Sequence, residues 1–296
     1  MSKHLPPVCD YEGSDYQTRF WEEGGRAYED RVEAIALQRL LPPGGAFMLE
    51  LGAGAGRNTP RYQGYRRIAL VDYSRTQLEQ ARKRLGASSH YLYVAADVYR
   101  LPFVAGLFDG ATMIRTLHHM ADPVLALTQL RRVMAPQGAF ILEFANKRNL
   151  KSMLRYLLGK QTWNPYTLEP VEFAALNFDY HPKAIRGYLS EVGFKVEKQL
   201  TVSHFRVSAL KRAVPLRLLA GLDALLQWTG AWVQVSPSVF VRARATNFGQ
   251  SANGDGLFQC PACQASIPGE GHDLLCGGCG RTWVYQDGIY DFRLKD

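Results

Sequence analysis

The feature that most constrains this chain is a regular alternation of short apolar runs and helical segments between residues 46 and 144. Five apolar runs predict buried strands, and the stretches 74–85 and 123–134 between them have helical periodicity. The predicted strands are 46–51, 67–72, 91–96, 108–114 and 138–144. Alternating strands and helices form a mostly parallel sheet covered on both faces. We therefore predict an α/β, Rossmann-like, doubly wound fold.

The remaining segments are less regular and suggest an appended domain. A helix is expected over residues 14–41, and a helix over 182–191 followed by strands at 194–202 and 238–245 completes the large domain. We predict a large domain over residues 1–247, with a substrate lid and helical insert at 146–236. The polar, glycine-rich residues 248–256 are then a linker, and 257–296 form a small second domain.

Composition and charge place the chain among ordinary globular proteins. Hydrophobic residues make up 47% and charged residues 21%, and the net charge is +8. This charge would attract nucleic acid or an anionic membrane, although the basic residues are scattered along the chain. The longest apolar region, 216–235, is interrupted by polar residues and predicts a surface or buried helix. With no leader pattern in view, we expect a cytoplasmic protein.

A glycine-rich turn follows the first predicted strand, where ligands bind in such sheets. Gly52, Gly54 and Gly56 leave the backbone bare enough for a ligand to approach closely. A dinucleotide-binding motif would need glycine where Arg57 stands. Glu50 at the entrance of the turn would repel a pyrophosphate but can pair with an ammonium group.

Two further acids end the next two predicted strands. Asp72 stands where a carboxylate accepts hydrogen bonds from ribose hydroxyls, and Asp97 lies beside the same cleft. The alternative for Glu50, Asp72 and Asp97 is a strand-end acid that caps the next helix. If these acids bind a ligand, a nucleoside that carries a positive amine and no phosphate fits them. S-adenosylmethionine is such a compound.

Five segments in register resemble the class I S-adenosylmethionine-dependent methyltransferases, in particular the type 11 group that includes ubiquinone and menaquinone methylases. The resemblance spans residues 45–145 and continues more loosely to 247. The segments are LELGAGAGRNTP from Leu49, VDYS from Val71, AADV from Ala95, FDGATMIRTLHHMADP from Phe108 and RRVMAPQGAFILEF from Arg131. The resemblance implies a seven-stranded sheet, use of S-adenosylmethionine and release of S-adenosylhomocysteine.

The resemblance also implies roles for individual residues. The methionine part of the cofactor would lie against Glu50, Gly52, Ala53, Gly54 and Gly56. Asp72 would hold the ribose, Tyr73 would pack on the adenine, and Asp97 and Val98 would meet the adenine edge. Arg115 and Thr116 would contact the methionyl end, although a packing role for Arg115 is equally open. Near the N-terminus, Tyr16, Arg19 and Tyr28 would close over the cofactor.

The adjacent His118 and His119 are the candidate catalytic residues. Methyl transfer from a sulfonium needs alignment of the acceptor and sometimes a base that takes its proton. Either histidine could serve, since a neutral imidazole accepts a proton near neutral pH. The alternative is a packed or capping histidine.

Four cysteines near the C-terminus form two knuckles, Cys260-Pro-Ala-Cys263 and Cys276-Gly-Gly-Cys279, separated by twelve residues. This spacing predicts one structural zinc ion held by four thiolates, with no open position for catalysis. The following segment to Arg293 resembles the zinc-ribbon activators of tRNA and translation-factor methyltransferases. In those systems the ribbon binds a separate catalytic subunit, whereas here it follows one in the same chain.

The sequence leaves the methyl acceptor open. We expect the acceptor to be a small metabolite, and possible acceptors include lipid-like or isoprenoid compounds. We also expect peripheral membrane contact through residues 211–232. The main alternative is an RNA or protein methyltransferase that uses the basic charge and the zinc ribbon to bind its substrate. A third hypothesis is a binding module without catalysis, against which the intact Glu50, Asp72 and Asp97 argue.

Overall fold

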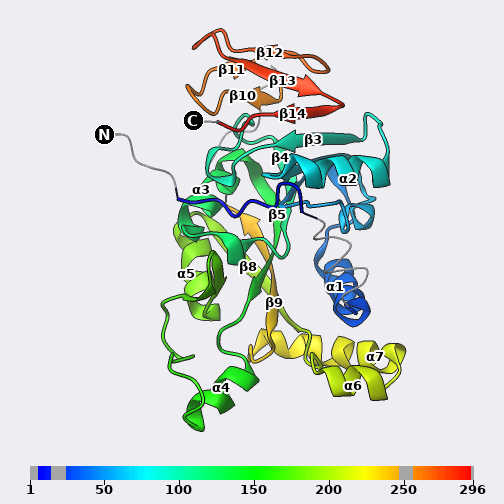
Figure 1. The fold of residues 1–296 in the computed structure, drawn as a ribbon, viewed down its shortest axis with the longest axis vertical. Helices are drawn as coiled ribbons and strands as arrows, with labels where there is room; N and C mark the ends of the chain where they lie inside the picture. Colours follow the sequence, from blue (N-terminus) through cyan, green and yellow to red (C-terminus); the bar gives the residue numbers. More distant parts are fainter. Residues whose placement is uncertain (1–5, 15–24, 247–255, 295–296) are drawn as a thin grey trace.

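The protein is built around one ten-stranded sheet, described by a computed structural model that covers residues 6–14, 25–246 and 256–294 (Figure 1). The strand order is β12-β13-β14-β3-β2-β1-β4-β5-β9-β8. The seven strands that belong to the large domain are β1 (Gly45–Leu51), β2 (Tyr65–Asp72), β3 (Tyr91–Ala95), β4 (Phe108–Met113), β5 (Met134–Ala145), β8 (Phe194–Val202) and β9 (Ser238–Ala245).

This seven-stranded unit confirms the predicted α/β architecture. Strands β1 to β5 pair in parallel, and β9 lies antiparallel to both β5 and β8. Two of the helices begin at residues expected from capping chemistry: the Ser74 side chain accepts from the Gln77 amide, and Asp122 caps the helix that starts at Pro123. The helices are α1 (Ala27–Leu40), α2 (Arg75–Leu85), α3 (Pro123–Val133), α4 (Leu150–Leu157), α5 (Pro182–Glu191), α6 (Ser208–Ala213) and α7 (Leu216–Leu226).

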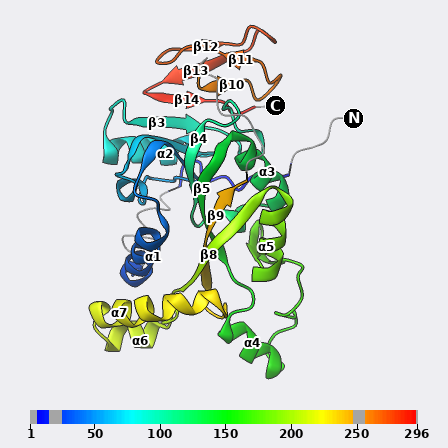
Figure 2. The same ribbon diagram turned by 180° about the vertical axis from the view of Figure 1, so that it is seen from behind.

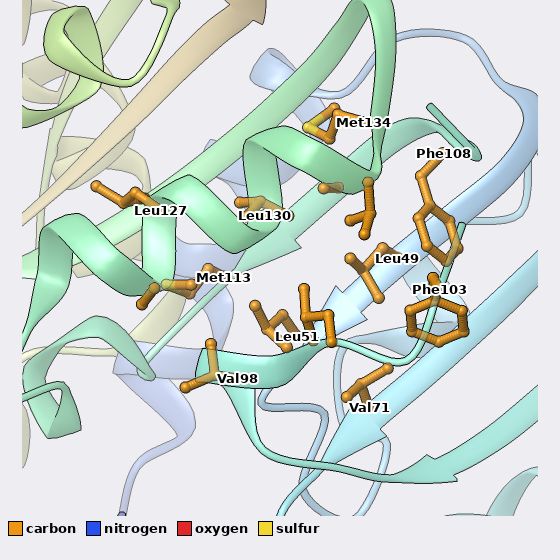
Figure 3. Packing of buried hydrophobic residues seen from close by; sticks show 14 of the residues in the cluster. Leu49, Leu51, Val71, Val98, Phe103, Phe108, Met113, Leu127, Leu130 and Met134 are labelled. Atoms are coloured by element: carbon orange, nitrogen blue, oxygen red, sulfur yellow. The ribbon is translucent and has the colours of Figure 1, made fainter. Parts of the chain in front are cut away.

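Helices cover both faces of this sheet. Leu127 and Leu130 of α3 pack with Leu49 and Leu51 of β1 and with Met113 of β4 (Figure 3). A second cluster, which joins α1, α7 and strands β5, β8 and β9, is formed by residues such as Val32, Leu37, Leu200, Leu219 and Phe240. Burial on both faces explains why the strands are nearly continuous apolar runs.

The C-terminal segment extends the same sheet. Its strands are β10 (Phe258–Gln259), β11 (Ser266–Ile267), β12 (Leu274–Leu275), β13 (Thr282–Gln286) and β14 (Ile289–Asp291). Strand β14 pairs in parallel with β3, so this C-terminal segment (residues 257–294), which we call the ribbon, lies along the edge of the large sheet (Figures 1 and 2). An aromatic cluster continues from Phe103 to Phe258 and Phe292 across the junction. The ribbon and the large domain therefore share one core.

Some local predictions differ from the structure. The predicted helix over 14–41 is observed only as α1, which begins at Ala27, while residues 15–24 lie outside the described part of the chain. The predicted lid contains α4 and a hairpin of β6 (Val171–Ala174) and β7 (Asn177–Asp179). Of the predicted linker, only Gly256 is described. The division into domains stays a prediction.

Four short 3-10 helices complete the elements of the described residues. They are η2 (Thr59–Arg61), η3 (Val98–Arg100), η4 (Leu117–His119) and η5 (Gln227–Ala231). The last of them, η5, directly follows α7. Among the described residues, none of the helices is long and apolar enough to cross a lipid bilayer.

Candidate cofactor cleft and cysteine cluster

A cleft opens at the carboxyl ends of β1, β2 and β4, where the sequence places the glycine-rich turn. Gly52, Gly54 and Gly56 all have positive φ, a conformation that disfavours other residues. A Cβ at Gly52 would lie 2.1 Å from Thr116 Oγ1. Of the predicted cofactor residues, those that line the cleft are Gly52, Ala53, Gly54, Asp72, Tyr73, Val98, Arg115 and Thr116.

Asp72 lies at the end of β2 and holds the glycine turn in place. Its Oδ2 accepts a hydrogen bond from the Gly54 amide at 2.8 Å, and its Oδ1 accepts one from Ser74 at 2.9 Å. Burial raises the pKa of this carboxyl, while the two amides oppose the shift. Each carboxylate oxygen keeps a second lone pair for a ligand hydroxyl.

Glu50 lies beneath the turn and does not line the cleft. Its Oε2 accepts a hydrogen bond from Thr59 Oγ1 at 2.6 Å, and the side chain is buried. Burial raises the pKa of Glu50 to about 7, against the hydrogen bond from Thr59 and the charges of Arg57 and Arg61. A carboxyl that ionises near neutral pH would respond strongly to a cation bound nearby.

Asp97 has the geometry of a helix cap. Its Oδ1 accepts from the Tyr99 amide at 2.8 Å, which begins a short 3-10 helix, and its side chain does not line the cleft. The neighbouring Val98 does line it. Burial raises the pKa of Asp97. The capping alternative thus accounts for the contact that the structure shows for Asp97.

Arg115 points its guanidinium toward α1. It donates to Glu33 through Nε at 2.8 Å and also through Nη2, while Arg57 Nη2 donates to the other Glu33 oxygen at 2.9 Å. Burial opposes ionisation of Glu33, yet the charges of Arg115 and Arg57 hold its pKa below the ordinary value. Arg115 also has a positive φ, with its amide bonded to Glu143. The residue that breaks the dinucleotide motif, Arg57, therefore fastens α1 to the turn.

The N-terminal residues 8–14 cross the cleft, and the sequence did not indicate this. Val8, Cys9 and Tyr11 line the cleft. Glu12 accepts from the first amides of α2, those of Arg75 and Thr76, at 3.0 Å each. This arrangement satisfies amides that have no partner within the helix. Glu12 lacks any sequence motif that would have revealed the contact.

The predicted N-terminal contacts have different outcomes. Tyr16 and Arg19 lie outside the described residues. Tyr28 does not close over the cleft, because its hydroxyl donates to the buried Asp223 of α7 at 2.6 Å and the ring belongs to the core. The hydrogen bond to α7 and the burial of the ring in the core explain why Tyr28 faces the interior.

Of the two candidate catalytic histidines, one lines the cleft and the other does not. His119 lines the cleft, and both of its ring nitrogens have partners: Nδ1 lies 3.0 Å from the Leu176 carbonyl and Nε2 3.1 Å from the Tyr11 hydroxyl. Since a carbonyl only accepts, Nδ1 carries the proton and Nε2 accepts from Tyr11. The His118 ring packs against the His119 ring at a tilt of 44° and does not line the cleft. Desolvation lowers the pKa of both rings, which keeps them neutral.

Arg293 brings the ribbon to the cofactor cleft. Its Nη1 donates to the Tyr73 carbonyl at 3.1 Å and to Glu12 Oε2 at 2.9 Å. Its guanidinium also lies over the Tyr73 ring, 5.7 Å from the centroid. Asp291 of β14 orients Arg293 through Oδ2 at 2.7 Å. One side chain therefore connects the ribbon, the N-terminal segment and a residue of the cleft, a connection that no local sequence signal reveals.

The four predicted metal ligands come together. The Sγ atoms of Cys260, Cys263, Cys276 and Cys279 all lie within 4.8 Å of one another. The distances are 3.8 Å between Cys260 and Cys279 and 3.4 Å between Cys263 and Cys276. Tetrahedral Zn–S bonds of about 2.3 Å require sulfur separations of about 3.8 Å. The Cys279 amide is the main cause that lowers the pKa of Cys276 to about 6. This donor set fits a four-thiolate metal site.

Comparisons with known proteins match this geometry. Residues 49–142 match the family model described as a methyltransferase domain. The chain contains a methyltransferase domain. The fold agrees with this match, because a solved S-adenosylmethionine-dependent methyltransferase shares it.

Curated relatives align with parts of the chain. The O-methyltransferase cnsE of Penicillium expansum is 30% identical over 147 residues, 46% of this chain and 52% of that protein. The demethylmenaquinone methyltransferase of Clavibacter sepedonicus is 25% identical over 199 residues, 66% of this chain and 78% of that protein. The chain thus spans about half the length of the first of these relatives.

Solved structures share the fold at low sequence identity. One chain of a Haloferax volcanii complex between the Trm112 methyltransferase activator and a methyltransferase has a TM-score of 0.54 at 16% identity, covering 78% of this chain and 98% of that chain. An S-adenosylmethionine-dependent methyltransferase of Mesorhizobium loti has a TM-score of 0.51 at 19% identity, covering 74% and 100%. The [4+2]-cyclase SpnF also shares the fold, with a TM-score of 0.52 at 19% identity over 76% and 86%. These likenesses concern the fold alone.

Proposed function

We propose that this protein transfers a methyl group from S-adenosylmethionine to a small, lipid-like or isoprenoid metabolite. The observation that carries the proposal is the glycine turn fastened by Asp72 above the buried carboxyl of Glu50. A bare backbone with two nearby carboxyls and no glycine at position 57 favours a cationic nucleoside over a phosphorylated coenzyme.

The proposed cofactor contacts follow from the residues that line the cleft. Asp72 would accept the ribose hydroxyls, Tyr73 would pack on the adenine, and Val98 would line the adenine pocket. The methionine part would lie along Gly52, Ala53 and Gly54, with Glu50 behind the turn. For Arg115, the contacts with Glu33 favour a role in fastening α1 over a direct bond to the cofactor carboxylate.

The cofactor supplies an activated sulfonium methyl. On transfer, the acceptor would bond to the methyl carbon, and the electron pair of the broken sulfur–carbon bond would stay on sulfur to give S-adenosylhomocysteine. The protein must align the acceptor and exclude water. His119 is the better placed base because it lines the cleft and is neutral. Its Nε2 would take the acceptor proton only after Tyr11 moves away. His118 remains the alternative base.

A lipid-like acceptor agrees with two observations. The relatives include a demethylmenaquinone methyltransferase and an O-methyltransferase. In addition, the insert at residues 211–232, which we propose for peripheral membrane contact, exposes large apolar side chains such as Leu225 and Trp232. The rival function is methylation of RNA or protein, which the net charge of +8 and the Trm112-bound structural neighbour favour.

We also propose that one structural zinc ion binds the four cysteines and holds residues 257–296 as a zinc ribbon. Four thiolates would leave no position for substrate, so the metal would stabilise and not catalyse. Its effect would reach the large domain through the pairing of β14 with β3. Elemental analysis of the purified protein tests this site directly.

The decisive experiment for the function has two steps. Calorimetry with S-adenosylmethionine, and with NAD as the competing ligand, tests the cofactor; binding of NAD alone would reject the proposal. Cell extracts are then incubated with enzyme and methyl-labelled cofactor, and the lipid, RNA and protein fractions are separated. Label in the lipid fraction supports the proposed acceptor, whereas label in RNA or protein supports the rival.

A further inference from the structure

Helix α4 presents an apolar stripe to solvent. Leu150, Leu154, Leu157 and Leu158 are all exposed, Leu157 by 70%. Their spacing of four, seven and eight residues puts them on one helical face. The opposite side includes the buried Ser152. A soluble helix normally turns such a stripe toward a core, so this stripe lacks a partner among the described residues.

Helix α7 and the 3-10 helix η5 present a second apolar stripe. Leu218, Leu222 and Leu225 follow helical spacing, and Trp232, which is 82% exposed, continues the exposed apolar surface. The inward face is already packed, with Leu219 buried and Asp223 bonded to Tyr28 of α1. The exposed stripe is therefore not the face that attaches this helix to the domain.

The two stripes lie at the same end of the molecule. In Figures 1 and 2, α4, α6 and α7 occupy the lower end, opposite the ribbon. Two hydrogen bonds connect the segments: the Leu150 amide donates to the Val235 carbonyl at 2.8 Å, and Asn146 Nδ2 donates to the Gln234 carbonyl at 3.1 Å. The start of α4 is thus fixed beside the end of the insert.

We call residues 150–160 and 207–233 the apolar end. The charged residues of the apolar end indicate what kind of partner it has. Residues 150–160 contain Lys151, Arg155 and Lys160 and no acidic residue. In residues 207–233 the basic residues are Lys211, Arg212 and Arg217, and the only acidic residue, Asp223, is buried. Lys211 pairs with Glu29, whereas Arg212 and Arg217 are exposed.

We propose that the apolar end docks on the surface of a membrane rich in anionic lipid. Apolar side chains flanked by Lys and Arg insert at the level of the headgroups, where the basic groups meet lipid phosphates. A second copy of the chain fits less well, because a symmetric contact would oppose like charges. This inference rests on the proposed function in that it adds α4 to the membrane contact and names the lipid charge.

The test is co-sedimentation of the full-length protein with vesicles, without cofactor or acceptor, so that its result is independent of methyl transfer. Vesicles of phosphatidylcholine alone are compared with vesicles that also contain phosphatidylglycerol. We expect binding to the anionic vesicles, weakened by salt, with a blue shift of tryptophan fluorescence that is reduced in Trp232→Phe. Leu154→Glu and Leu225→Glu should each weaken binding by about tenfold.

The matched control is Leu275→Glu, because Leu275 is 65% exposed but lies in the ribbon at the other end. It should leave vesicle binding unchanged. Thermal melting and S-adenosylmethionine affinity show that each variant is folded. The proposal is overturned if no vesicle binds, if neutral vesicles bind equally well, or if Leu275→Glu weakens binding as much as the other two. A dimer that Leu225→Glu dissociates, seen by light scattering without vesicle binding, would assign the surface to a second copy.

Discussion

Large apolar side chains are buried at one end of the molecule and exposed at the other. At the ribbon end, Phe258, Trp283 and Phe292 are buried in a core shared with the large domain, and β14 covers the edge strand β3. At the apolar end, comparably large side chains such as Trp232 remain exposed. The difference teaches that the ribbon is an internal partner, whereas the apolar end is the surface that we propose contacts a membrane. Substitutions at one end should therefore leave the other unaffected.

The largest effect is expected from a substitution in the cysteine cluster at the ribbon end. Cys276→Ser removes a buried thiolate, and a structural zinc contributes on the order of 10 kcal/mol to the folding of such a small domain. We expect loss of bound zinc, a lower melting temperature and faster hydrogen exchange in β14 and β3. Cys9→Ser, outside the cluster, is the control for stability. Unchanged melting, together with absence of zinc from the intact protein, would reject the metal site.

The second prediction separates two acids that look alike in sequence. Asp72→Ala removes the carboxylate that would hold the ribose and that accepts two amides, and should weaken S-adenosylmethionine binding by about a hundredfold or more. Asp97→Ala removes a cap, which costs about 1 kcal/mol of stability with little change in affinity. Calorimetry and melting measure both effects. Equal losses of affinity would show that Asp97 also contacts the cofactor.

The third prediction tests whether the ribbon end reaches the cofactor. Arg293→Ala removes charge-assisted hydrogen bonds to Glu12 and Tyr73, and should weaken S-adenosylmethionine binding by about tenfold. Arg281→Ala, which removes only a contact over Trp283, should not alter the affinity. Neither substitution should change vesicle binding. If the two variants bind the cofactor equally, Arg293 has no positioning role.

The smallest expected effect concerns Glu50 and pH. Because its pKa is raised to about 7, the neutral carboxyl favours the folded state, and this contribution is lost as pH rises through about 7. The cofactor ammonium favours the ionised form, so S-adenosylmethionine affinity should rise several-fold from pH 6 to 8 with release of a proton. Glu50→Gln should bind more weakly and remove this part of the pH dependence. A wild-type profile that matches Glu50→Gln would show that Glu50 does not sense the ligand.

The predictions made from sequence succeeded where the signal is local. The strands from 46 to 144 were located by their apolar runs, and the glycine turn by residues that need positive φ. The four cysteines were found by their spacing. Prediction was poorer for Tyr28, whose ring packs inward because its hydroxyl meets Asp223, almost two hundred residues away. For Asp97 the sequence favoured cofactor contact, whereas the structure shows a cap, because both roles place an acid at a strand end.

The sequence by itself determined the α/β architecture, the bare turn beside two acids and the thiolate cluster, because backbone conformation and ligand spacing act over a few neighbouring residues. Only the tertiary structure decided that β14 continues the sheet beyond β3 and that Arg293 meets Tyr73. It also decided that α4 and α7 expose their stripes at the same end. These relations depend on which surfaces the folded chain brings together, and residues far apart in sequence carry no local mark of that contact.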